Sequence, residues 1–130
     1  MGAMNITLLP EKLCICRLAP DAGIPAWLPS SGFVSLTRTA DELSIVCPEE
    51  TVPEEVICDR GWRGLQVEGP LDFSLIGVLV SLADPLAEAG VSLFAVSTYN
   101  TDYILVKQAQ LSDAHLALTA AGHRITSELD

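Results

Sequence analysis

The sequence predicts an α+β fold, and three observations in its second half support this prediction. A polar lead-in is followed by an apolar run with helical spacing that ends at residues 89–90, Ala-Gly. Two short strand-like runs come next, joined at residues 99–102, and a second helical run begins at Ser112. With the strand before the first helix, the element order is β-α-β-β-α. Since 49% of the 130 residues are hydrophobic, the chain can build a buried core.

In the first half of the chain, alternating apolar residues predict mainly strands. The expected strands of this half cover residues 12–18, 33–38, 43–47, 56–58 and 62–68. Residues 39–42 have the length of a hairpin connection. Residues 20–32 contain three prolines and two glycines and predict a loop. The acidic residues 48–55, which include two prolines, predict a short helical turn or a loop.

The clearest helix lies in the second half of the chain. Either Asp72 or Ser74 can cap its first turn with a side-chain oxygen. Its apolar residues are Leu75, Ile76, Leu79, Leu82, Ala83 and Leu86. Pro85 has no N–H to donate to the Ser81 carbonyl, so we expect a kink or a new turn there. The remaining elements are strands over residues 91–98 and 103–107 and a last helix from Ser112 to near Gly122.

The order of these elements matches the ferredoxin-like fold, with the first half of the chain as a degenerate copy of the second. We therefore expect two units in tandem. The degenerate unit covers residues 4–61, and a β-α-β-β-α-β unit covers residues 62–130. Residues 1–3 precede a second methionine, Met4, and are expected to be a vector remnant.

The composition excludes several classes of function. The formal net charge is −10 and no two of the seven basic residues are adjacent, which argues against binding to nucleic acids or acidic membranes. No apolar run reaches the roughly 18–20 uncharged residues of a membrane span. The N-terminal residues lack the basic start and apolar core of a signal peptide, so we expect a cytoplasmic protein.

The four cysteines show no spacing typical of a metal site. Cys14 and Cys16 are two residues apart in a strand-like run, so their side chains point to the same face. A metal site would need Cys47 and Cys58 to converge on them, and neither a C-x-x-C pair nor a flanking histidine supports such a convergence. We expect buried free thiols, with a disulfide as the alternative, and neither a metal ion nor a cofactor.

No pattern in the chain points to catalysis. The sequence has no G-x-S-x-G nucleophile motif and no phosphate-binding loop, so we expect a protein that is not an enzyme. His115 and His123 lie eight residues apart in the last helical segment and are expected to face solvent. Trp27 and Trp62 are expected in the core.

Residues 76–93, with the sequence IGVLVSLADPLAEAGVSL, resemble the first helix and the following strand of an ACT domain. Residues 77–79, Gly-Val-Leu, and residues 86–90, Leu-Ala-Glu-Ala-Gly, match that family's pattern residue for residue. Residues 97–106 are similar to a branch of small proteins with two ACT-like units, related to the arginine-sensing proteins upstream of TORC1 signalling. The resemblance covers residues 62–125 closely and the earlier strands in outline.

The resemblance implies ACT-like units that bind a small molecule, in particular a free amino acid, for regulation. It also implies a homodimer. The family usually has an aspartate two residues before a proline at the helix start, and here these positions are Ser74 and Ile76. Asp72 or Asp102 is expected to replace that aspartate. The alternative function is a structural or interaction module that dimerises through its sheets or helices without a ligand.

The ligand site is expected at the start of the clearest helix and at the strand connection beside it. A helix N-terminus offers free N–H groups and the positive end of a dipole to a carboxylate. Gly77 lacks a Cβ and allows close approach, and Asp102 can bind an ammonium group. The expected ligand-binding residues are Leu71, Asp72, Phe73, Ser74, Gly77, Ser97, Thr98, Asn100 and Asp102. Purely structural roles are the alternative, with Asp72 as a helix cap and Asn100 and Asp102 as turn residues.

Overall fold

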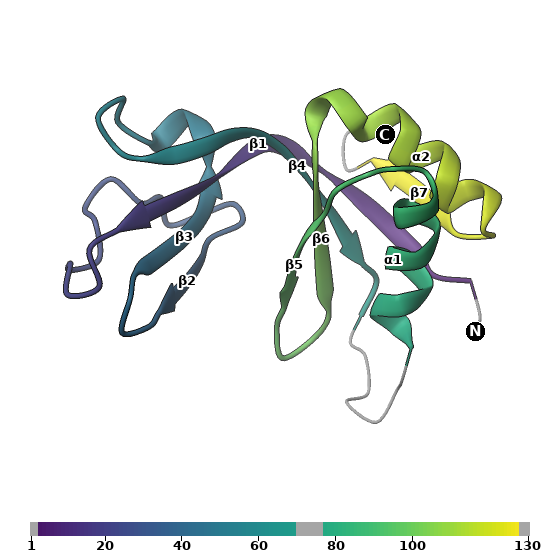
Figure 1. Ribbon diagram of the computed structural model, residues 1–130, viewed down its shortest axis with the longest axis horizontal. Helices are drawn as coiled ribbons and strands as arrows, with labels where there is room; N and C mark the ends of the chain where they lie inside the picture. Colours follow the sequence, from purple (N-terminus) through teal and green to yellow (C-terminus); the bar gives the residue numbers. More distant parts are fainter. Residues whose placement is uncertain (1–2, 70–76, 128–130) are drawn as a thin grey trace. The chain divides into compact units, whose positions relative to one another are not determined.

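The computed structural model describes residues 3–69 and 77–127, and the chain divides into two compact units (Figure 1). The helical unit combines the N-terminal residues up to Pro10 with the residues from Arg63 onward. The strand unit comprises Glu11–Trp62. Two long strands, β1 (Asn5–Leu18) and β4 (Cys58–Val67), contribute residues to both units.

The helical unit consists of a mostly antiparallel sheet and two helices. Its further elements are α1 (Val78–Glu88), β5 (Phe94–Ser97), β6 (Asp102–Lys107), the 3-10 turn η2 (Gln108–Gln110), α2 (Leu111–Ala120) and β7 (Arg124–Ser127). The strand order is β7-β1-β4-β6-β5. Because β6 lies between β4 and β5, the β4-α1-β5 segment is split as in a ferredoxin-like fold. The first residues of β1 lie between β4 and β7 and pair in parallel with β7.

One continuous core stabilises the helical unit. The helices α1 and α2 lie side by side and pack on the same sheet (Figure 1). In α1 the buried residues Val78, Leu82 and Leu86 recur every four positions, so they form one face of the helix. The buried members of this core are Ile6, Leu65, Val67, Leu82, Leu86, Val91, Ile104, Val106, Ala114 and Leu118. The apolar positions read from the sequence include Leu82 and Leu86 of this buried face but not Val78.

A buried histidine compensates for a proline inside α1. His123 is 6% exposed, and its Nδ1 accepts a hydrogen bond from the Met4 N–H at 3.0 Å. Its Nε2 therefore carries the ring hydrogen and donates it to the Ser81 carbonyl at 3.0 Å. Pro85 follows Ser81 by four residues and has no N–H, so the histidine supplies the hydrogen bond that the helix lacks. The expectation that His123 faces solvent is wrong, whereas His115 is exposed as expected.

The strand unit, every residue of which is described, contains no α-helix. The strands β2 (Ser35–Arg38) and β3 (Leu43–Pro48) form an antiparallel pair, and the order is β2-β3-β1-β4. A 3-10 turn, η1 (Glu49–Thr51), follows β3. The core of the unit contains three cysteines and the apolar residues Leu43, Ile45 and Val52. Trp27 packs against this core and Trp62 is buried, as the sequence predicts.

Several boundaries differ from those expected. The predicted strand over residues 12–18 is only the second half of β1, and the segments 56–58 and 62–68 form one strand, β4. Residues 4–10, which the sequence analysis assigns to the first unit, belong to the helical unit because the first residues of β1 pair with β7. The pairing partner of these residues is 119 positions further along the chain, so local alternation gives no sign of it.

Candidate ligand-binding site

The start of α1 supplies only one described member of the predicted site. Leu71, Asp72, Phe73 and Ser74 lie outside the described residues. Gly77 is the N-cap of α1, a position that the sequence analysis gives to Asp72 or Ser74. Its φ of 81° is a left-handed conformation that glycine adopts without strain, and its carbonyl accepts a hydrogen bond from the Ser81 N–H at 2.8 Å.

The other four predicted residues come together in the turn between β5 and β6. Ser97 and Asp102 are opposite each other where the two strands end. Thr98 closes the turn by forming hydrogen bonds with both the carbonyl and the N–H of Thr101. Its N–H and its hydroxyl donate to the Thr101 carbonyl at 2.8 and 3.0 Å, and its hydroxyl accepts from the Thr101 N–H at 3.3 Å. Asn100 is exposed between them.

Thr101, which the sequence analysis leaves out of the site, anchors this turn. It is 5% exposed, and its hydroxyl donates to the Val67 carbonyl at 2.7 Å. Val67 is the last residue of β4, so the turn is fixed beside the point where the chain leaves that strand toward α1. Figure 1 shows the turn, the end of β4 and the start of α1 toward the same end of the helical unit. A threonine in a turn gives no sign in the sequence that its hydroxyl is buried.

The turn presents polar groups above this anchor. Ser97, Thr98 and Asn100 are exposed, and Asp102 is half-buried. Tyr99 is 82% exposed at the tip. One carboxylate, three hydroxyls and one amide therefore lie on a turn whose backbone is fixed by hydrogen bonds, an arrangement suited to binding a polar cation.

A polar groove of about 430 Å³ lies elsewhere on the helical unit. It is lined by Asn5, Thr7, Gln66, Glu68, Gly69, Arg124 and Thr126. The Asn5 side-chain amide donates to a Glu68 carboxylate oxygen at 2.8 Å. Glu68 and Arg124 carry opposite charges, which is the combination that a zwitterion needs. This groove was not predicted from the sequence, although polar residues alternate in β1 (Asn5, Thr7) and in β7 (Arg124, Thr126).

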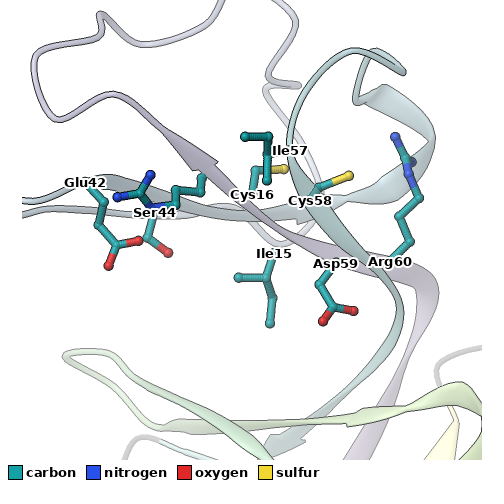
Figure 2. A pocket seen from close by; sticks show the side chains of 9 residues that line it. Ile15, Cys16, Glu42, Ser44, Ile57, Cys58, Asp59 and Arg60 are labelled. Atoms are coloured by element: carbon teal, nitrogen blue, oxygen red, sulfur yellow. The ribbon is translucent and has the colours of Figure 1, made fainter.

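The strand unit has a groove of its own, of about 520 Å³, between the ends of three strands. It is lined by Ile15, Cys16, Arg17, Glu42, Ser44, Ile57, Cys58, Asp59 and Arg60. Figure 2 shows Cys16 and Cys58 pointing to one side of their strands, while Ile15 and Asp59 point to the other. Two thiols thus border a groove that also carries arginine and carboxylate side chains.

The cysteines converge, contrary to what their spacing in the sequence indicates. All four are free. The Cys14 sulfur is 3.6 Å from the Cys16 sulfur and 4.0 Å from that of Cys47. The sulfurs of Cys14, Cys16 and Cys58 all lie within 4.8 Å of one another. The convergence results from strand pairing, since Cys14 and Cys47 are opposite each other in β1 and β3.

Hydrogen bonds and burial give the thiols of Cys14, Cys16 and Cys47 different pKa values. The hydrogen bond shared by the Cys14 and Cys47 sulfurs raises the pKa of Cys14 and lowers the pKa of Cys47 to about 7. Burial raises the pKa of Cys16 to about 11. Cys47 is therefore the first of these three thiols to give up its proton as the pH rises.

Comparison with protein families follows the division into two units. A model of the ACT domain matches residues 57–120. A second model, of an N-terminal domain, matches residues 11–55, almost the whole strand unit. Among the described residues, no helix has the length and apolar character needed to cross a membrane.

Individual relatives agree with these matches. The chain is 33% identical over 117 residues to the cytosolic arginine sensor for mTORC1 subunit 1 of Pongo abelii, covering 83% of this chain and 36% of that protein. The crystal structure of an Agrobacterium tumefaciens protein superposes with a TM-score of 0.92 at 38% identity, covering 98% and 96% of the two chains. The regulatory subunit of aspartate kinase from Thermus flavus has the same fold, with a TM-score of 0.65, 10% identity and coverage of 93% and 99%.

Proposed function

Because the chain belongs to the ACT-domain family, we propose that it is a regulatory protein, not an enzyme, that binds a free amino acid in its helical unit. The turn of residues 97–102 carries this proposal. Hydrogen bonds from Thr98 and Thr101 fix its backbone, and its polar side chains other than that of Thr101 remain exposed or half-buried. A site held on a fixed scaffold loses little conformational entropy when a ligand binds.

The two ends of an amino acid match two features of this part of the unit. The first N–H groups of α1 have no acceptor within the helix and can bind a carboxylate. Gly77, at the N-cap, has no Cβ to exclude that carboxylate. Asp102 binds the ammonium or a cationic side chain, and Ser97 and Asn100 add neutral hydrogen bonds. Asp102 is therefore the residue whose charge decides affinity.

The ligand that we propose first is arginine. A relative with 33% identity is named an arginine sensor, and the net charge of −10 favours a cationic ligand. The chain spans 36% of that relative's length, so the downstream partner of this chain is not inferred from it. We also propose that the strand unit is a degenerate ACT-like unit, and that the protein acts in the cytoplasm.

A thermal-shift panel of the twenty amino acids tests the proposal. A ligand at about 100 times its dissociation constant stabilises the native state by about 2.7 kcal/mol. For a chain of this size we expect the midpoint of unfolding to rise by about 5–10 °C. We expect a saturable rise with arginine or another amino acid. If no amino acid changes the midpoint at millimolar concentration, the protein is the interaction module described as the alternative.

The variant Asp102→Asn tests the location of the site. It keeps the shape of the side chain and removes the charge, so we expect it to abolish most of the ligand-induced shift. Asp21→Asn is the matched control, since Asp21 is exposed in a loop of the strand unit. A shift that survives in Asp102→Asn but disappears in Glu68→Gln would place the ligand in the polar groove of the helical unit instead.

We further propose that two chains form a homodimer through the helical unit. The strand β5 is at the end of the strand order, and such an edge can pair with a second chain. Val80 of α1 and Leu116 of α2 are 56% and 68% exposed, so the helices also offer apolar contacts. Sedimentation equilibrium is expected to give twice the chain mass of 13.9 kDa. A mass of one chain at micromolar concentration would remove this proposal.

A further inference from the structure

Three of the four cysteines, Cys14, Cys16 and Cys58, have sulfurs within 4.8 Å of one another in the strand unit, and the Cys47 sulfur lies 4.0 Å from that of Cys14. Cys14 and Cys16 come from β1, Cys47 from β3 and Cys58 from β4. These strands are neighbours in the order β3-β1-β4, so the cluster extends across three adjacent strands. The arrangement depends on the fold and not on a short sequence motif.

The spacing of the sulfurs fits a metal ion placed between them. Zinc binds thiolates at about 2.3 Å in tetrahedral sites, which places neighbouring sulfurs about 3.8 Å apart. The Cys14–Cys16 and Cys14–Cys47 distances of 3.6 and 4.0 Å lie on either side of that value. The sulfur of Cys58 is within 4.8 Å of two of them, so small side-chain rotations bring it to ligand distance.

The surroundings of the cluster favour a soft ion that enters from the groove of the strand unit. Cys14, Cys16 and Cys47 are at most 1% exposed, but Cys58 is half-buried. Cys16 and Cys58 line the groove of about 520 Å³ (Figure 2), which gives an ion a route from solvent. Arg17 and Arg60 line the same groove and offset the negative charge of thiolate ligands. Sulfur ligands select zinc or copper(I) and disfavour calcium and magnesium, which require oxygen.

We propose that Cys14, Cys16 and Cys58 bind a soft d¹⁰ metal ion, zinc(II) or copper(I), with Cys47 as the fourth ligand. Each thiol that becomes a ligand releases its proton to water as the metal–sulfur bond forms. Neither the sulfurs nor the ion change oxidation state. The ion joins β3, β1 and β4 and stabilises the strand unit, which has no α-helix to enlarge its core.

Titration of the reduced, metal-free full chain tests this proposal. Zinc(II) and copper(I) are added separately in competition with a chromophoric chelator for each ion. We expect one ion per chain for zinc(II) or copper(I), and a higher midpoint of thermal unfolding when that ion is bound. Cobalt(II), used as a spectroscopic probe for zinc, is expected to show sulfur-to-metal charge-transfer bands. Stoichiometric binding that leaves the midpoint unchanged would mean that the ion binds the folded and the unfolded chain equally well, and would overturn the proposal.

The test variant replaces Cys58, which is the most exposed of the four cysteines. Cys58→Ser is expected to fold, because Cys58 is half-buried, and to weaken binding by more than the roughly 100-fold known for loss of an outer-shell partner. Ile57→Ser is the matched control in the same groove, since Ile57 is 72% exposed, and should bind as the unaltered chain does. Equal affinity in Cys58→Ser, no binding of either ion at micromolar concentration, or a disulfide forming in place of the metal complex would each overturn the proposal.

Discussion

His123→Leu is expected to lower the free energy of unfolding by about 2–4 kcal/mol, because two part-buried backbone groups lose their partner at once and the side chain that bonds them is buried. The Met4 N–H and the Ser81 carbonyl each form a hydrogen bond of 3.0 Å with the imidazole ring. Leucine fills similar space and forms neither bond. Urea unfolding followed by circular dichroism measures the change.

Pro85 gives this prediction an internal check. Pro85→Ala restores an N–H that can donate to the Ser81 carbonyl within α1. In the Pro85→Ala background, His123→Leu should therefore lower the free energy of unfolding by about 1 kcal/mol less than it does in the unaltered chain. His115→Leu, on the exposed side of α2, should change stability by no more than about 0.5 kcal/mol. If His123→Leu and His115→Leu lower the free energy of unfolding equally, the role assigned to His123 is contradicted.

Thr101→Val is expected to destabilise the protein by about 1–3 kcal/mol and to loosen the turn of residues 97–102. Valine has the shape of threonine but cannot donate to the Val67 carbonyl, which the Thr101 hydroxyl reaches at 2.7 Å in a buried position. Amide hydrogen exchange should become faster at Thr98, whose N–H donates to the Thr101 carbonyl. Urea unfolding gives the loss of stability.

Thr37→Val is the matched control for this variant. Thr37 is exposed in β2, so the same chemical change there should be close to neutral, within about 0.5 kcal/mol. If Thr101→Val lowers the free energy of unfolding as little as Thr37→Val does, or leaves amide exchange at Thr98 unchanged, the turn does not depend on the Thr101 hydroxyl.

Local patterns in the sequence were sufficient to predict the helices and most strands of the helical unit and part of its candidate ligand-binding site. The apolar spacing of α1 identifies Leu82 and Leu86 of its buried face, and the residues around position 100 indicate the turn between β5 and β6. These features depend on contacts within a few residues. The resemblance to the ACT-domain family, confirmed by the family model over residues 57–120, adds the fold class.

The features that the sequence did not reveal all depend on distant pairing. The first residues of β1 pair with β7, Cys14 meets Cys47, and His123 reaches Ser81. In each case the partners are more than 30 positions apart, and neither partner carries a local pattern that marks it. The start of α1 shows another limit, because a glycine N-cap is less common than the aspartate or serine that the sequence offers a few residues earlier.

Amide NMR of the isotopically labelled chain, titrated with the amino acid that raises the unfolding midpoint, tests the central claim most directly. We expect saturable shifts of the Gly77 signal and of the signals from residues 97–102. Residues 11–62 of the strand unit should show no saturable shifts. Unchanged spectra with every amino acid at millimolar concentration would contradict amino-acid binding. Shifts confined to Asn5, Glu68 and Arg124 would contradict the location and assign the ligand to the polar groove.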